Sequence, residues 1–244
     1  MQPDSGKTVT QEKVSEDFDR YVESYTQQID DAVSFSGLKA DFFVKAKCEY
    51  LLRLTERYLG SNADLHVLDL GCGVASYHHH LVTKYKSLTG IDVSRKSIEY
   101  AEQHNENVRY DVYPGGTLPY DDNQFDVAFA VCVMHHVPTG DWPVFVEQMK
   151  RVLKPGGLGV VFEHNPVNPL TWRIVSNCPI DADAVLLKQK EIRALFEDAG
   201  FDAIRTRSIL SIPPIAGPLY PVDETLGLIG LGAQYYMTAR KPLG

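Results

Sequence analysis

The chain has 244 residues, and its 24 Lys and Arg stand against 32 Asp and Glu, a formal net charge of −8. This acidic balance, with no Lys/Arg stripe, argues against a protein that grips a nucleic-acid backbone. The apolar runs fall far short of the ~18 residues of a membrane span, and no signal peptide is visible, so we expect a cytoplasmic protein without a membrane partner. The cysteines are scattered without a CxxC pair, which predicts reduced thiols and no metal site; they are Cys48, Cys72, Cys132 and Cys178.

The N-terminal quarter shows helical periodicity. Apolar and aromatic side chains recur three and four residues apart, at Val14, Phe18, Tyr21, Val22, Tyr25 and Ile29. This spacing places them on one face of a helix, and a second helix is predicted over Ala40–Tyr58. We expect residues 1–60 to form a helical arm that acts as a lid, with Met1–Thr10 disordered.

From Leu65 onward, short apolar strands alternate with helical stretches. The predicted strands are His66–Leu70, Ser87–Asp92, Val108–Tyr113, Phe125–Val131, Leu158–Glu163, Ala203–Ser211 and Ala233–Lys241. The predicted helices between them are Ala75–Lys86, Arg95–Asn105, Asp141–Leu153 and Lys188–Ala199. This alternation predicts an α/β domain over residues 61–244, doubly wound around a mostly parallel sheet. The Pro- and Gly-containing segment 212–232 is predicted to be a flap over a substrate.

The strand Val67–Leu70 runs into a glycine-rich turn, Gly71-Cys72-Gly73, and then into a helix. Glycines at this point let the backbone approach a ligand closely, and the following helix N-terminus favours an anionic group. Asp92 ends the next strand, 21 residues after Gly71. An acid at this spacing accepts hydrogen bonds from ribose hydroxyls, so the sequence predicts an adenosine-containing ligand.

Two residues distinguish among adenosine cofactors. A dinucleotide-binding loop would carry Gly or Ala where this chain has Ser76. Asp69, just before the turn, would repel a pyrophosphate but attract an ammonium or a sulfonium group. S-adenosylmethionine carries both positive groups, so it is the predicted cofactor, with S-adenosylhomocysteine as its product.

The segments VLDLGCG, GIDVS, LPYDDNQFDVAFA, VCVMHHV and LKPGG resemble those of the class I S-adenosylmethionine-dependent methyltransferases, best their small-molecule branch. The resemblance covers about Leu65–Phe162. It implies seven strands in the order 3-2-1-4-5-7-6, with the seventh strand antiparallel. It also implies that Gly71, Cys72 and Gly73 border the methionine part of the cofactor and that Asp92 holds the ribose.

For the rest of the cofactor, the resemblance implies that Gly116, Thr117 and Leu118 lie against the adenine and that the backbone at Val131–Cys132 faces the amino group. Many relatives carry an acid shortly before the Leu-Pro pair, whereas this chain has Pro114-Gly115-Gly116. The adenine contact is therefore expected from the backbone alone or from Asp111. The full set of expected cofactor-binding residues is Tyr21, Tyr25, Asp69, Gly71, Cys72, Gly73, Asp92, Val93, Gly116, Thr117, Leu118, Val131, Cys132 and His136.

The histidines divide into two kinds. His78, His79 and His80 are adjacent on a predicted helix and do not share a face, so we expect a solvated or half-packed surface there. His135 follows the fourth strand and His164 ends the fifth, at the edge where parallel sheets bind ligands. Either is a candidate catalytic residue that takes a proton from an acceptor hydroxyl, and His136 is expected to orient its loop.

The predicted function is in-line transfer of a methyl group from S-adenosylmethionine to a small-molecule acceptor, such as a secondary metabolite or a sugar-like compound. A tRNA or protein methyltransferase and a non-catalytic S-adenosylmethionine-binding protein stay open as alternatives. The acidic charge counts against an RNA substrate, and the retained acids and glycines count against loss of catalysis. Neither the acceptor atom nor the oligomeric state follows from the sequence.

Overall fold

The structure is a computed structural model that describes residues 10–34, 37–212 and 219–244. Its centre is a seven-stranded sheet in the order β3-β2-β1-β4-β5-β7-β6, in which β7 runs antiparallel to both of its neighbours. The strands are β1 (His66–Leu70), β2 (Ser87–Asp92), β3 (Arg109–Val112), β4 (Phe125–Val131), β5 (Leu153–His164), β6 (Asp202–Ile209) and β7 (Gln234–Arg240). The predicted strand order and the antiparallel last strand are confirmed.

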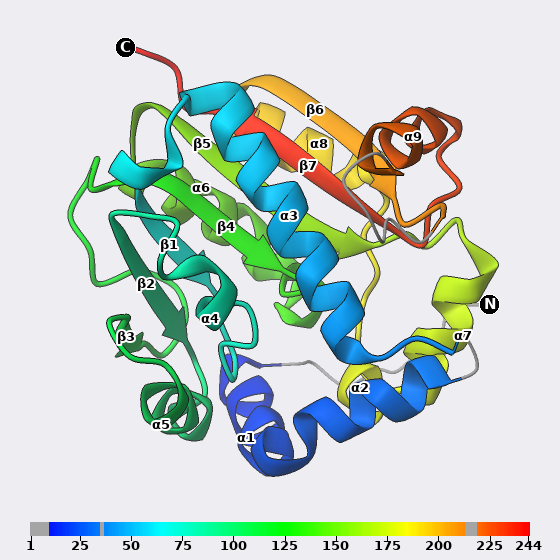
Figure 1. The fold of residues 1–244 in the computed structure, drawn as a ribbon. Coiled ribbons are helices and arrows are strands. Elements are labelled where there is room, and N and C mark those ends of the chain that lie inside the picture. The colour runs from blue at the N-terminus through cyan, green and yellow to red at the C-terminus, as the bar shows by residue number, and fades with distance from the viewer. Residues whose placement is uncertain (1–9, 35–36, 213–218) are drawn as a thin grey trace.

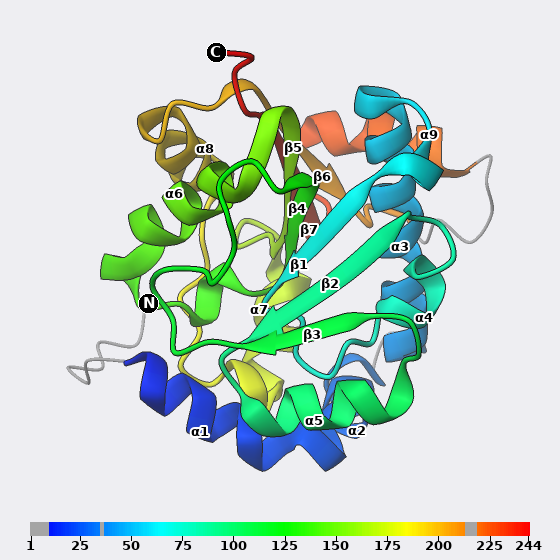
Figure 2. The same ribbon diagram turned by 90° about the vertical axis from the view of Figure 1, so that its left-hand side faces the viewer.

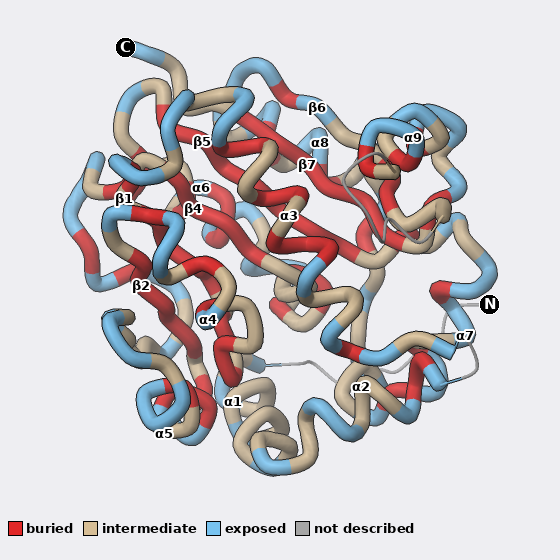
Figure 3. Tube along the Cα trace, in the orientation of Figure 1, coloured by how far each residue is buried: buried red, intermediate tan, exposed pale blue. Residues whose placement is uncertain are grey.

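The helices are α1 (Gln11–Tyr21), α2 (Tyr25–Val33), α3 (Ala40–Leu59), α4 (His78–Leu81), α5 (Arg95–His104), α6 (Trp142–Val152), α7 (Pro169–Asn177), α8 (Gln189–Asp198) and α9 (Leu219–Leu226). Helices α3, α4 and α9 lie on one side of the sheet, and α6 and α8 lie on the other (Figures 1 and 2). The strands β1, β4 and β5 are buried on both faces (Figure 3). They therefore consist of nearly continuous apolar residues, as expected for the centre of a parallel sheet.

The alternation of side chains along the central strands divides the core into two clusters. Val67 and Phe129 pack in the cluster that contains the α3 residues Tyr50 and Leu54. Leu68 packs in the opposite cluster with residues of α6 and α8. Because neighbouring residues of a strand point to opposite faces, both helical layers are held by the same strands.

The N-terminal arm is broken rather than continuous. A short 3-10 turn at Val22–Ser24 separates α1 from α2, where the periodicity predicts one uninterrupted helical face. The two helices lie across the end of the sheet at which the arrowheads of the central strands point (Figure 1). Thr10, expected to be disordered, caps α1, since its hydroxyl accepts a hydrogen bond from the N–H of Lys13 at 3.3 Å; residues 1–9 lie outside the described part.

Several predicted boundaries change in the structure. The helix predicted over Ala75–Lys86 is reduced to α4, because the chain up to Tyr77 forms loop and turn around the glycine-rich segment. The strand predicted over Leu158–Glu163 begins earlier, because residues Leu153–Gly157 belong to β5, whose pairing with β4 is irregular there. Helices α7 and α9 have no counterpart among the predicted helices. Within the described residues, no helix is both long enough and apolar enough to cross a bilayer.

The segment 212–232, predicted to be a flap over a substrate, contains α9 in its described part. Residues 219–226 form α9, which packs beside β6. Buried Asp223 fixes the preceding loop, because its carboxylate accepts hydrogen bonds from the N–H groups of Leu210 and Ser211 and from the hydroxyl of Tyr50. Residues 213–218 lie outside the described part, and the flap stays a prediction.

Candidate functional site

A cavity opens at the carboxyl ends of β1, β2, β4 and β5, beneath the N-terminal arm. It holds about 1420 Å³ of empty space, its open mouth included. Both the glycine-rich loop and the predicted catalytic histidines line it. The cavity therefore connects the predicted cofactor-binding loop with the predicted catalytic histidines.

The glycine-rich loop presents backbone to this cavity. Gly71 has a φ of 79°, and a Cβ at this position would lie 2.6 Å from Cγ1 of Val133. Gly73 has a φ of 51°, and a Cβ there would have no neighbour within 4 Å, so its backbone faces open space. Ala75 also has a positive φ, of 58°. The close packing at Gly71 and the open space beside Gly73 are consistent with a ligand that lies against the loop.

Asp92 is held in place by the loop that it faces. Its Oδ2 accepts a hydrogen bond from the N–H of Gly73 at 2.8 Å, and its Oδ1 accepts one from the N–H of Ser94 at 2.8 Å. Burial raises the pKa of this carboxyl group to about 6, although both N–H groups lower it. The carboxylate therefore lines the cavity in a fixed orientation with accepting capacity to spare, as a ribose-binding acid requires.

Asp69 lines the cavity but is shared with a histidine. The Oδ2 of Asp69 lies 2.9 Å from Nε2 of His78, and Nδ1 of His78 lies 2.7 Å from the hydroxyl of Tyr110. Both members of the Asp69–His78 pair are buried, and burial raises the pKa of Asp69 while His78 lowers it. The prediction of a solvated or half-packed His78 is wrong, because this side chain is buried against Asp69. His79, the next residue, is exposed as predicted.

The residues expected at the adenine lie in the loop between β3 and β4. Gly116, Thr117 and Leu118 do not line the cavity, and Leu118 is a core residue whose N–H donates to Oε1 of Gln148. Asp111 is not at the cavity either, because its carboxylate accepts a hydrogen bond from Tyr120 and pairs with Arg109. Tyr113, the residue after β3, is the side chain that reaches the cavity from this loop.

The N-terminal arm closes one side of the cavity. Tyr25 and Phe18 line it, whereas Tyr21, also expected at the cofactor, does not. The ring of Phe18 stands edge-on against His136, with 5.0 Å between ring centroids. Further along, the Ser15 hydroxyl donates to the carbonyl of Val93 at 2.9 Å. The arm thus contacts residues from both the predicted cofactor side and the predicted acceptor side.

The arm is also anchored to α5. Oδ1 of Asp19 accepts a hydrogen bond from the Ser94 hydroxyl at 2.6 Å and a longer one from the N–H of Lys96 at 3.3 Å. Both donors belong to the N-terminus of α5, where a negative charge is stabilised by the helix dipole. One carboxylate therefore couples the arm to the helix that follows Asp92.

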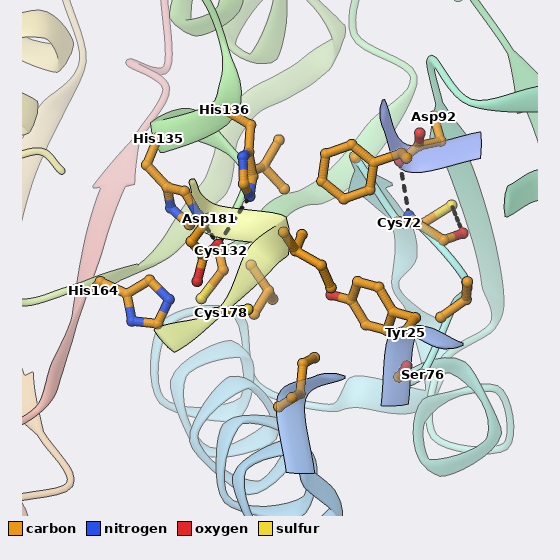
Figure 4. A pocket seen from close by; sticks show the side chains of 18 of the residues that line it. Tyr25, Cys72, Ser76, Asp92, Cys132, His135, His136, His164, Cys178 and Asp181 are labelled. Atoms are coloured by element: carbon orange, nitrogen blue, oxygen red, sulfur yellow. Dashed lines mark hydrogen bonds and ion pairs between the residues drawn. The ribbon is translucent and has the colours of Figure 1, made fainter. Parts of the chain in front are cut away.

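The opposite end of the cavity gathers polar side chains from distant segments (Figure 4). Nδ1 of His135 lies 2.5 Å from Oε2 of Glu163, and Nε2 of His135 lies 3.4 Å from Oδ1 of Asp181. His136 approaches the same Asp181 oxygen, also at 3.4 Å. Burial lowers the pKa of His135, but the two carboxylates outweigh it and hold this pKa well above its usual range.

His164 differs from His135 in its surroundings. It is half-buried, lines the cavity, and its Nδ1 lies 3.4 Å from Nε2 of Gln234. The rings of His135 and His164 lie 5.2 Å apart. The structure therefore brings both predicted catalytic histidines to one place. Among the described contacts, His135 pairs with two carboxylates, whereas His164 pairs with none.

Cys132 follows Val131 at the end of β4, and both line the cavity. Cys132 has a φ of 56°, rare for a residue with a side chain. Its Sγ lies 3.5 Å from Nζ of Lys47. Burial raises the pKa of this thiol, but the charges of Lys47 and His164 lower it to about 7. The fold thus places a readily ionised thiol beside a buried ammonium group in the cavity.

Two residues of this site were missed from the sequence. Lys47 is buried in α3, with its Nζ 3.3 Å from the Tyr77 hydroxyl. The sequence held an indication of this burial. Lys47 stands four residues after Phe43 and three before Tyr50, which places it on the same face of the helix as these aromatic residues. Asp181 gave no such signal, since it lies in an irregular segment that reaches the histidines only through the tertiary fold.

The comparisons with known proteins agree with this architecture. Residues 68–161 match the family described as a methyltransferase domain. Methyltransferase GfsG of Streptomyces halstedii is 28% identical over 79% of this chain and 73% of that protein. Squalene methyltransferase 2 of Botryococcus braunii is 27% identical over 71% of this chain, which spans only 49% of that relative's length.

Among solved structures, a methyltransferase from Thermotoga maritima described as a possible histamine N-methyltransferase superposes with a TM-score of 0.64. That comparison covers 93% of this chain and 99% of the other at 18% identity. At 18% identity, this comparison shows that the two proteins share a fold.

Proposed function

We propose that the chain is a class I S-adenosylmethionine-dependent methyltransferase, which transfers a methyl group from S-adenosylmethionine to a small-molecule acceptor. The observation that carries this proposal is the two-ended cavity. Asp92 and the glycine-rich loop line one end, and the His135–Asp181 group lines the other. One cavity thus offers a cofactor subsite and an acceptor subsite.

The residues at the first end fit the cofactor. Bound S-adenosylmethionine supplies a methyl group on a positively charged sulfur. Asp92 would accept hydrogen bonds from its ribose, Asp69 would supply negative charge, and the Gly71–Gly73 backbone would lie against it. Lys47 adds a buried positive charge to the same cavity, which suits a carboxylate of either ligand.

The chain contributes to the transfer mainly by alignment. The acceptor atom attacks the methyl carbon in line with the departing sulfur, and holding both in one geometry accounts for most of the acceleration. The arm residues Phe18 and Tyr25 reduce the access of water to this space. For an acceptor hydroxyl, we assign the role of proton acceptor to His164 rather than His135, because both ring nitrogens of His135 face carboxylates.

The acceptor is proposed to have an apolar body and a polar reacting group. Apolar residues from several elements surround the histidine group, among them Val137, Phe145, Ile174 and Ile180. The relatives named for squalene and for GfsG are consistent with a small organic acceptor. Residues of α1 and α2, among them Phe18 and Tyr25, line the cavity, so a tRNA or protein substrate would have to enter beneath these helices, which favours the small molecule. The cytoplasmic location and the absence of nucleic-acid and membrane partners stay predictions.

Turnover tests the proposal directly. The full chain is incubated with S-adenosylmethionine and with phenols, alcohols, amines and enolisable ketones in turn, and the formation of S-adenosylhomocysteine is measured. Acceptor-dependent turnover that is lost in Asp92→Ala supports the proposal. Tight binding of S-adenosylhomocysteine without turnover on any small molecule would instead favour the non-catalytic alternative, and turnover only on RNA or protein would overturn the assigned acceptor class.

A further inference from the structure

Three side chains at the acceptor end point at one another from segments far apart in the sequence. His135 and His136 come from the 3-10 turn Met134–His136 after β4, and Asp181 comes from the turn Pro179–Asp181 after α7. One ligand atom of each lies within 4.8 Å of the other two. Figure 4 shows both imidazole rings directed at the carboxylate of Asp181.

We propose that Nε2 of His135, Nε2 of His136 and Oδ1 of Asp181 bind a divalent transition-metal ion, for which Zn²⁺ is the best fit. Tetrahedral Zn²⁺ with bonds of about 2.0–2.1 Å holds its ligand atoms roughly 3.3–3.4 Å apart. Both Nε2 atoms lie 3.4 Å from Oδ1 of Asp181. Two imidazoles, one carboxylate and an open position are the ligand set of catalytic zinc and of related metal sites.

A second observation points to the same ligand. Nε2 of His135 is buried and has no hydrogen-bond partner, although Asp181 lies 3.4 Å away. An unpaired nitrogen in such a position is unfavourable unless something occupies the space that it faces. A metal ion placed among the three atoms would take the place of a proton on this nitrogen and bind its lone pair.

Glu163 supports this arrangement from behind. Its Oε2 accepts from Nδ1 of His135 at 2.5 Å, and its Oε1 accepts the N–H of Met134 at 2.8 Å. A carboxylate on Nδ1 keeps the proton on that nitrogen, which leaves Nε2 as the metal-binding atom. Glu163 is fully buried and so holds the ring rigidly.

The proposed ion would define the acceptor more narrowly, and this step rests on the proposed function. His135, His136 and Asp181 all line the cavity, so the remaining coordination position faces the acceptor. A hydroxyl oxygen bound there would lose its proton more readily, because the ion lowers its pKa. The oxygen would release its proton to His164 or water and form the new bond to the methyl carbon, while the electrons of the broken carbon–sulfur bond stay on sulfur. The acceptor class is therefore a metal-binding hydroxyl compound.

The sequence predicts no metal site, because the three proposed ligands do not lie together along the chain. The adjacent histidines alone supply two ligands, and the third ligand comes from 45 positions further along the chain than His136. Only the fold brings Asp181 next to them.

Metal binding is measured without reference to activity. The full chain is stripped with a chelator and titrated with Co²⁺ and Zn²⁺, following the visible absorption of tetrahedral Co²⁺ and the heat of Zn²⁺ binding. We expect about one ion per chain, with tetrahedral Co²⁺ absorption. Glu163→Gln should weaken binding roughly 10–100-fold, and Asp181→Asn and His136→Ala by at least as much. Asp181→Asn changes a partly exposed side chain by one atom, so it is informative even if Glu163→Gln folds poorly.

A matched control removes the other histidine pair, whose rings lie 3.8 Å apart, in the variant His79→Ala/His80→Ala. The proposal requires this variant to bind the ion as the wild type does. Binding that survives Asp181→Asn but is lost in the control variant would overturn the site, as would the absence of stoichiometric binding. If the ion binds as expected but no small molecule is methylated, the metal site stands and the proposed function fails.

Discussion

Nε2 of His78 lies 2.9 Å from Oδ2 of Asp69, and both side chains are buried beneath the glycine-rich loop. The acid expected to face the cofactor is therefore held from behind by a histidine of the following helix. Because His78 also contacts the Tyr110 hydroxyl, the pair ties β1, α4 and β3 together. Loss of the histidine would leave a buried carboxylate without this partner.

His78→Ala should lower the free energy of unfolding by about 2–4 kcal/mol, because it removes one member of a buried hydrogen-bonded pair and leaves a cavity. Tyr110→Phe removes only the hydroxyl contact and should lower it by about 1 kcal/mol. Urea unfolding measures both, and His79→Ala, at an exposed neighbouring position, should stay within about 0.5 kcal/mol of the wild type. Equal values for the two histidine variants would contradict a structural role for His78.

Asp92→Ala should weaken the binding of S-adenosylhomocysteine by roughly 10–150-fold, equivalent to about 1.5–3 kcal/mol, because it removes a charged acceptor for the ribose hydroxyls. It also leaves the N–H groups of Gly73 and Ser94 without their partner. Titration calorimetry gives the affinity, and Glu99→Gln on the exposed face of α5 is the control. An unchanged dissociation constant would remove Asp92 from the site.

The affinity for S-adenosylhomocysteine should fall as the pH drops below about 6, because burial raises the pKa of Asp92 to about 6 and the protonated acid is the poorer acceptor. The effect on stability has the opposite sign. The folded protein holds this proton more tightly than the unfolded chain, so the contribution of Asp92 to stability falls as the pH rises from about 4 to about 6. Calorimetry at several pH values measures the affinity. In Asp92→Asn this pH dependence should disappear, and its persistence would assign it to another group.

Cys132 should react with iodoacetamide at pH 7 at least ~100-fold faster than Cys48 or Cys178, because thiolates are the reactive form. The charges of Lys47 and His164 bring the pKa of Cys132 to about 7 against the effect of burial, whereas burial raises those of Cys48 and Cys178 to about 12. Peptide mass spectrometry gives the rate at each site. Lys47→Met should slow the reaction at Cys132, and labelling spread evenly over the thiols would refute the electrostatic argument.

Asp19→Ala should release the N-terminal arm, because it removes both hydrogen bonds to the start of α5. We expect faster hydrogen exchange over residues 11–30 and weaker cofactor binding, with little change at the sheet. Glu16→Ala, at an exposed position of the same helix, is the control. If the wild-type arm is protected equally with and without S-adenosylhomocysteine, it is a fixed wall and not a lid.

The sequence by itself determined the alternation of strands and helices and the glycine-rich turn. Local periodicity predicts the strands, and a short motif predicts the Gly71–Gly73 turn and the place of Asp92 at the end of the next strand, whereas the strand order came from the resemblance to the class I methyltransferases. The tertiary structure decided the rest. It buried His78 against Asp69, moved Gly116–Leu118 out of the cavity, and placed Lys47 and Asp181 inside it. These positions depend on how helices and irregular segments pack over the sheet, and no local pattern encodes the distance between residues that only packing brings together.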